Sequence, residues 1–110
     1  MNTIGFLKPV VINSYNDNQI IGKNTTTKTF NDSIAFLDFE IFLAKPIEVP
    51  IIWRSKLFGD VTINPTNNNS IKRSDLLKQP ILWWPRGQGD PFLYKDHWIL
   101  VDASNPMIFI

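Results

Sequence analysis

The chain has 110 residues, of which 44% are hydrophobic and 13% aromatic, a composition that excludes intrinsic disorder and suits one globular domain over residues 1–110. Its eleven basic and ten acidic side chains leave a net charge of +1, without the concentrated positive charge that most nucleic-acid-binding modules carry. The sequence holds no cysteine, which excludes disulfides, thiolate metal sites and cysteine nucleophiles.

Eight prolines and five glycines interrupt the chain and leave little room for long helices. Between them lie short runs rich in Ile, Val, Phe and Trp, the composition of β-strands. In chain order, the predicted strands are 10–13, 19–23, 34–43, 47–54, 57–63, 81–84, 97–102 and 107–110. Turn sequences separate many of them, at 13–18, 64–70, 86–91 and 103–106, and the TTTK sequence at 25–28 predicts a loop. We therefore expect an all-β fold, a small compact barrel or sandwich with at most one or two short helices.

Two segments have helical alternatives. The longest apolar segment, residues 33–45, contains three phenylalanines and two isoleucines, which favour a strand over a helix capped by Asp32 or Ser33. As a strand, it places the odd-numbered residues 35–43 on one face and the even-numbered ones, including Asp38 and Glu40, on the other. Residues 74–80 predict a short connecting helix with Ser74 as its cap.

The segment from 81 to 101, ILWWPRGQGDPFLYKDHWILV, holds three of the four tryptophans and the only histidine. Its two prolines enclose a Gly-x-Gly sequence, whose backbone N–H groups can form an anion-binding nest beside the Arg86 guanidinium. Trp and Arg are residue types in which binding energy concentrates. We expect a binding surface here, formed by Trp83, Trp84, Arg86, Gln88 and Asp90, with Tyr94, His97, Trp53 and Arg54 as its rim.

The same residues allow other interpretations. Arg86 can instead pair with Asp90 across its own turn while the tryptophans fill a small core. Catalysis has weaker support, because His97 in a strand points away from its neighbouring aspartates and no serine lies in a G-x-S-x-G sequence. Asp38 and Glu40 lie about 6.6 Å apart on one strand face, within the range of glycosidase carboxyl pairs, although they also fit the solvated stripe of an amphipathic strand.

The leading functional hypothesis is a non-enzymatic binding module that recognises a protein partner or a small anionic ligand, without a metal or cofactor. Its size and composition suit an accessory or assembly protein of a phage-like or viral system. One alternative is a single-stranded nucleic-acid-binding barrel of the OB or SH3-like type, which the balanced charge disfavours. A second alternative is a small hydrolase or lyase that uses Asp38, Glu40 or His97.

The last four residues, Met-Ile-Phe-Ile at 107–110, predict a strand that pairs within the sheet or mediates a homo-oligomer. The start of the chain lacks the pattern of a signal peptide, and no apolar run approaches the length of a membrane span. We therefore expect a cytoplasmic protein without membrane contact, located in the host cytoplasm or the virion if its source is viral.

Overall fold

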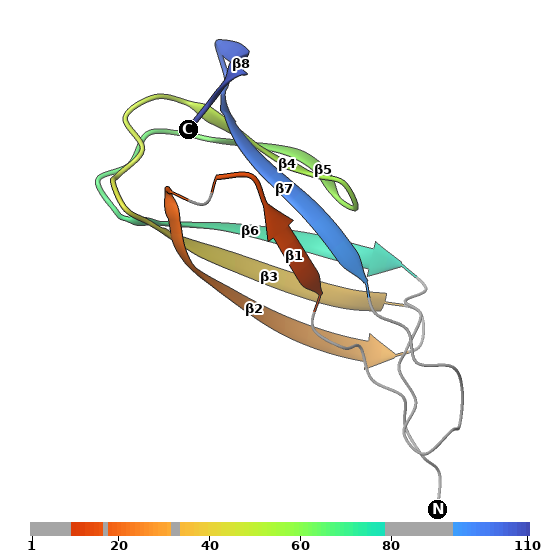
Figure 1. Ribbon diagram of the computed structural model, residues 1–110. Helices are drawn as coiled ribbons and strands as arrows, with labels where there is room; N and C mark the ends of the chain where they lie inside the picture. The colour runs from red at the N-terminus through yellow and green to blue at the C-terminus, as the bar shows by residue number, and fades with distance from the viewer. Residues whose placement is uncertain (1–9, 17, 32–33, 79–93) are drawn as a thin grey trace, which may run out of the picture.

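The computed structural model describes residues 10–16, 18–31, 34–78 and 94–110, and its regular elements are all β-strands (Figure 1). They are β1 (Val11–Ser14), β2 (Ile20–Asn31), β3 (Ile34–Leu43), β4 (Ile51–Ser55), β5 (Gly59–Ile63), β6 (Ser70–Lys78), β7 (Lys95–Asp102) and β8 (Asn105–Phe109). The predicted all-β class is therefore confirmed, and the segment 34–43 is a strand with the predicted bounds. The predicted strand at 81–84 and turn at 86–91 lie outside the described residues.

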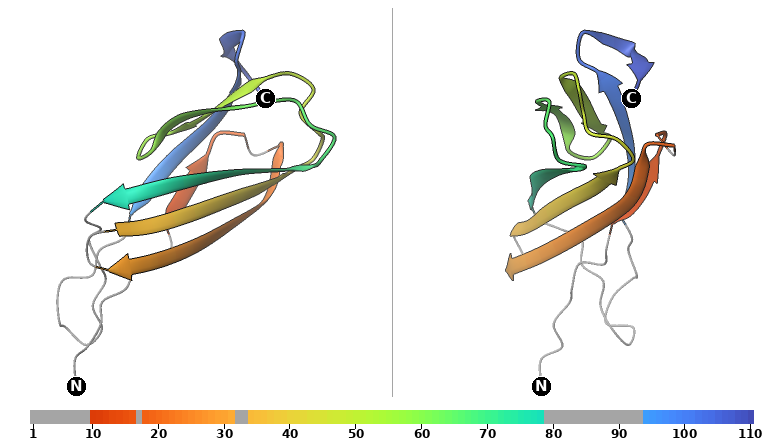
Figure 2. Two further views of the ribbon diagram at one scale, coloured as in Figure 1. Left: turned by 180° about the vertical axis from the view of Figure 1, so that it is seen from behind. Right: turned by 90° about the vertical axis from the view of Figure 1, so that its left-hand side faces the viewer.

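The strands form two sheets, which pack against each other as a small sandwich (Figure 2). One sheet has the order β1-β7-β4-β5, with β8 also paired to β7, and the other has the order β2-β3-β6. Strand β1 runs parallel to β7, and the other pairs are antiparallel. The three-stranded sheet thus has one face toward the core and one toward solvent.

The core lies between the sheets because each inner strand alternates apolar and polar residues. All five odd-numbered residues of β3 are buried, and they are Ala35, Leu37, Phe39, Ile41 and Leu43. From the other sheet, Trp53 of β4 and Trp98 of β7 face them, and both are fully buried. The Trp98 ring packs edge to face on Trp53 and on Phe39, with centroid separations of 4.8 and 5.1 Å.

Two predictions about local structure are wrong. The predicted helix at 74–80 is part of β6 as far as Lys78, because residues 70–78 pair with β3 and place Arg73 and Leu77 toward the core. The predicted loop at 25–28 lies inside β2, where it continues the antiparallel ladder with β3. In both cases the neighbouring strand satisfies backbone hydrogen bonds that a solvated loop or a short helix leaves to water.

Strands β1 and β8 share one edge of β7. β1 pairs with Lys95–Trp98, and β8 pairs farther along at Val101 and Asp102. Between them, the buried Asn16 side chain accepts a hydrogen bond from Leu100 N at 2.8 Å and donates to the carbonyls of Leu100 and Ile110 at 3.0 and 2.9 Å. The prediction of a C-terminal strand is confirmed, and every residue of β8 is exposed. Oligomerisation through it stays a prediction.

Candidate functional site

The centre of the binding surface predicted from the sequence lies outside the described residues, and comprises Trp83, Trp84, Arg86, Gln88 and Asp90. That surface stays a prediction. Of its predicted rim, Tyr94 is half-buried and packs against the core. The rim position assigned to Trp53 is wrong, because the alternation of β4 turns this side chain into the core, where it is fully buried.

The other two rim residues, His97 and Arg54, lie on the outer face of the five-stranded sheet. The His97 ring stacks with Tyr15 at a centroid separation of 6.4 Å, and its Nδ1 is buried without a hydrogen-bond partner among the described residues. Arg54 pairs with Asp60 at 3.4 Å. His97 faces away from Asp96, as predicted, and the buried Asp96 carboxylate accepts hydrogen bonds from Ser55, Leu57, Trp98 and the His97 main chain. Among the described residues, the donors to the Asp96 carboxylate thus do not include the His97 imidazole.

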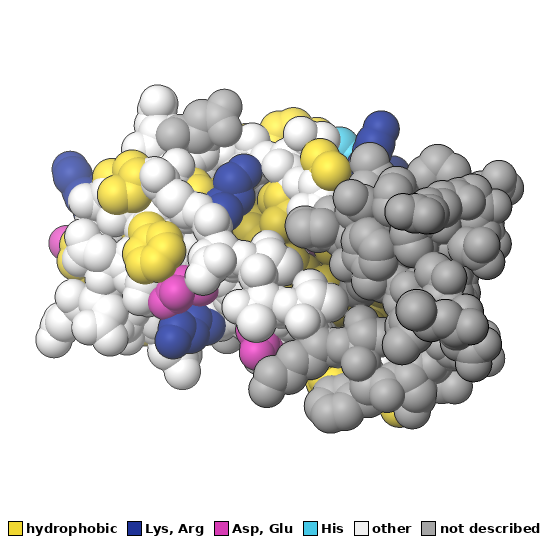
Figure 3. Space-filling view, turned by 90° about the horizontal axis from the view of Figure 1, so that it is seen from below, with side chains coloured by type: hydrophobic (Ala, Val, Ile, Leu, Met, Phe, Trp, Pro, Cys, Tyr) yellow, Lys and Arg dark blue, Asp and Glu magenta, His cyan; other side chains and the backbone are white. Residues whose placement is uncertain are grey.

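Asp38 and Glu40 lie on the outer face of the three-stranded sheet, in the middle of two cross-strand rows. Asp38 stands between Thr26 and Ser74, while Glu40 stands between Asn24 and Lys72. We call these six residues the polar grid: Asn24, Thr26, Asp38, Glu40, Lys72 and Ser74. They line a hollow of about 310 Å³. Figure 3 views the molecule from below, where acidic, basic and exposed apolar side chains lie next to one another.

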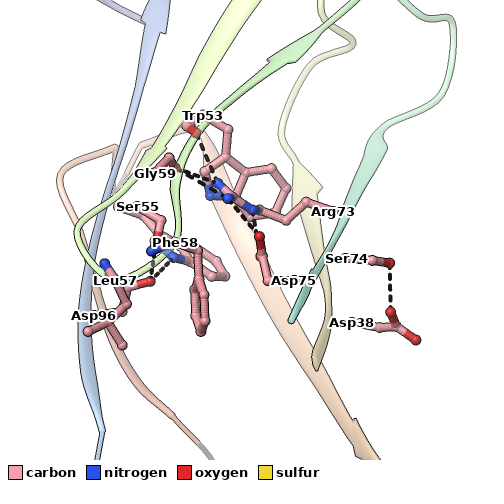
Figure 4. A network of polar contacts seen from close by, with 11 residues as sticks. Asp38, Trp53, Ser55, Leu57, Phe58, Gly59, Arg73, Ser74, Asp75 and Asp96 are labelled. Atoms are coloured by element: carbon pink, nitrogen blue, oxygen red, sulfur yellow. Dashed lines mark hydrogen bonds and ion pairs between the residues drawn. The ribbon is translucent and has the colours of Figure 1, made fainter. Parts of the chain in front are cut away.

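One hydrogen bond and one charge pair connect side chains of the polar grid on β3 to side chains on β6. The Ser74 hydroxyl donates to Asp38 at 2.6 Å (Figure 4). The Lys72 ammonium lies 3.7 Å from a Glu40 carboxylate oxygen. Phe39 and Arg73 also line the hollow, and because both side chains are buried on the opposite face, they contribute main chain to its floor. The hollow therefore has a backbone floor and polar walls.

An exposed phenylalanine lies beyond each end of the polar grid. Phe36 and Phe42 are 44% and 40% exposed, and they stand on the same face of β3 as the grid. Their six-residue separation corresponds to about 20 Å along the strand. Opposite Phe42 is Gly22, where an added Cβ would lie 3.3 Å from the Phe42 ring. The absence of a side chain at Gly22 thus lets this ring pack onto the sheet.

Beneath the hollow, a buried arginine connects the two sheets. The Arg73 guanidinium donates to both carboxylate oxygens of Asp75 at 2.8 and 3.0 Å, to the Trp53 carbonyl at 3.0 Å, and to the Gly59 carbonyl (Figure 4). It also lies 5.4 Å from the centre of the Trp53 ring, within the range of a cation–π contact. These contacts fix β6, and with it Lys72 and Ser74, relative to the other sheet.

Asp38 and Glu40 have polar surroundings. Asp38 is exposed beside the Ser74 hydroxyl, and Glu40 faces the Lys72 ammonium. The oxygens of both side chains are therefore placed to accept hydrogen bonds.

A second hollow, of about 460 Å³, lies between the segments 46–48 and 65–67, and Glu48 is its one charged lining residue. It offers fewer functional groups than the polar grid. Among the described residues, no three His, Asp or Glu side chains gather at a metal site. The described segments also include no helix that is long and apolar enough to cross a membrane. No protein-family model, curated protein or solved structure matches this chain.

Proposed function

We propose that this protein is a non-enzymatic binding module and that its recognition surface is the polar grid with Phe36 and Phe42. The observation that carries this proposal is the hollow of about 310 Å³, in which six polar side chains from three strands converge over a backbone floor. Its volume falls in the range of small-ligand sites, which place a few polar groups beside apolar ones. Rigid strands hold every contributing residue, so the surface is preorganised.

The charge of this surface separates the proposal from the nucleic-acid alternative. Asp38 and Glu40 occupy the middle strand, where they would face the phosphates of a bound strand. Single-stranded nucleic-acid binders instead present a positive groove. The surface predicted around Arg86, with a protein or a small anion as its ligand, is a separate proposal that the same experiment evaluates.

The proposal is tested by mapping where small molecules bind to the ¹⁵N-labelled full chain. We expect hits from a library of fragment-sized compounds to shift the backbone amides of the polar grid. A Phe42→Ala variant should lose these shifts, whereas Tyr15→Ala, which removes an exposed aromatic ring from the other sheet, should keep them. Hits that concentrate instead at residues 83–90, or around His97, would contradict the proposal.

An activity assay addresses the hydrolase alternative in the same preparation. The chain is incubated with nitrophenyl glycosides, and we expect no release of nitrophenol above the buffer rate. Release that disappears in both Asp38→Asn and Glu40→Gln, while the amide spectrum shows that each variant is folded, would identify an enzyme and overturn the non-enzymatic assignment.

A further inference from the structure

The hydrogen-bonding groups of the polar grid indicate the chemistry of its ligand. Asp38 and Glu40 only accept hydrogen bonds and the Lys72 ammonium only donates them, whereas the Asn24 amide and the hydroxyls of Thr26 and Ser74 do both. A phosphate or carboxylate ligand accepts hydrogen bonds and gives the two carboxylates no donor beyond Ser74 and Lys72. A ligand rich in hydroxyl groups, each of which donates and accepts, can pair with every member of the grid.

The charges of the grid nearly balance, which suits an uncharged ligand. Two carboxylates and one ammonium leave one net negative charge, and Glu40 and Lys72 already face each other at 3.7 Å. A polyanion is repelled by the carboxylates of Asp38 and Glu40, while a polycation is repelled by the Lys72 ammonium. A neutral ligand replaces the water on these groups and brings no opposing charge of its own.

The two phenylalanines add apolar contact at both ends of this polar centre. The Phe42 ring packs on Gly22 and is 40% exposed, so part of it remains available to a ligand. The face of an aromatic ring carries partial negative charge and attracts the weakly positive C–H groups of a sugar ring. With Phe36 about 20 Å away along the strand, a ligand that contacts both rings must be extended.

From these three features we infer that the ligand is a neutral oligosaccharide that lies along β3, with sugar rings against Phe36 and Phe42 and its hydroxyls bound by the polar grid. The inference rests on the proposed function of this surface and adds the class of ligand. It predicts that affinity rises with chain length, because a disaccharide is too short to reach both phenylalanines.

The test is a titration of the labelled full chain with cellohexaose, xylohexaose, mannohexaose and chitohexaose, together with the disaccharide of each. Oligothymidylate and oligolysine serve as charged probes. We expect at least one hexasaccharide to shift the amides of the grid, with an affinity about tenfold or more above that of its disaccharide. Removing the Phe42 ring should lower this affinity about tenfold, as expected for the loss of one aromatic contact.

Two further variants distinguish the loss of the aromatic stacking contact from the loss of the folded structure. Gly22→Val keeps the Phe42 ring but fills the space beneath it, so it should weaken hexasaccharide binding to a similar extent. Tyr15→Ala is the matched control on the other sheet and should bind with unchanged affinity. The amide spectrum of each variant reports whether it is folded.

The outcomes show separately whether the inferred ligand class is wrong and whether the proposed surface is wrong. If no hexasaccharide binds at millimolar concentration, the oligosaccharide inference is wrong, and the fragment screen decides separately whether the surface binds anything. If oligothymidylate or oligolysine shifts the grid amides and no saccharide does, the inferred ligand class is wrong, whereas the proposed surface is supported. If a hexasaccharide shifts amides outside the three-stranded sheet, and these shifts persist in Phe42→Ala, both the ligand class and the proposed surface are wrong.

Discussion

Replacing Arg73 with methionine should destabilise the fold strongly. The Arg73 side chain is 1% exposed, and its partner Asp75 is 10% exposed. The substitution keeps most of the buried volume but leaves the Asp75 carboxylate without its cation and removes the guanidinium donor from the carbonyls of Trp53 and Gly59. Breaking a buried ion pair from one side costs about 3–5 kcal/mol. Because Asp75 keeps some contact with water, we expect a loss of about 3 kcal/mol in the free energy of unfolding.

The assay is equilibrium unfolding in urea, followed by both circular dichroism and tryptophan fluorescence. A double variant, Arg73→Met with Asp75→Leu, should be destabilised by only about 1–2 kcal/mol, because no unpaired charge remains and two carbonyls lose their donor. The neighbouring Lys72→Met, which removes an exposed charge, should change stability by less than about 0.5 kcal/mol. A loss below about 1 kcal/mol for Arg73→Met, or a double variant no more stable than Arg73→Met, would refute this explanation.

Three other substitutions test separate features. Asn16→Ala leaves the buried N–H and C=O of Leu100 without their side-chain partner, so urea unfolding should show a loss of about 2–3 kcal/mol. Gly59 has φ of 83° with no atom within 4 Å of an added Cβ, so Gly59→Ala should cost about 1 kcal/mol through backbone strain alone, measured by thermal unfolding. Hydrogen bonds from the Ser104 hydroxyl and backbone hold the pKa of Asp102 below its ordinary value. A carboxyl with a lowered folded-state pKa contributes stability above its unfolded pKa and loses it as pH falls through the folded pKa. In Ser104→Ala, an NMR titration should therefore find the Asp102 pKa closer to its ordinary value, with a weaker acid dependence of stability at this group.

The strand at 34–43 could be predicted with its bounds because its odd-numbered positions are apolar and its even-numbered ones include Asp38 and Glu40. Strand β6 could not, because Ser74 resembles a helix cap and the residues after it are good helix formers. Pairing with β3 overrides this local preference. The inward-facing pair of Arg73 and Asp75 conceals the alternation further, since buried charged residues look like surface residues in a sequence.

The candidate site, too, can be predicted from the sequence only in part. The shared face of Asp38 and Glu40 follows from alternation in one strand, which the sequence reveals. Their neighbours on the grid depend on register between strands, and Thr26 and Ser74 come from segments predicted to be a loop and a helix. The sequence leaves the position of Trp53 open between rim and core for a related reason: composition identifies a strand, but it does not tell which tryptophan of the chain faces the core.

The pairing of β1 with β7 has a consequence for how the protein folds. Asn16 and Leu100 are 84 residues apart in sequence, yet their hydrogen bonds complete the edge of the five-stranded sheet. On the ribosome, β2, β3 and β6 can associate before β7 is synthesised, whereas β1 has to wait for its parallel partner. Contacts of such long sequence separation slow folding toward the millisecond-to-second range. The pairing of β1 with β7 is thus the folding step at which we expect nascent chains to be most exposed to mispairing.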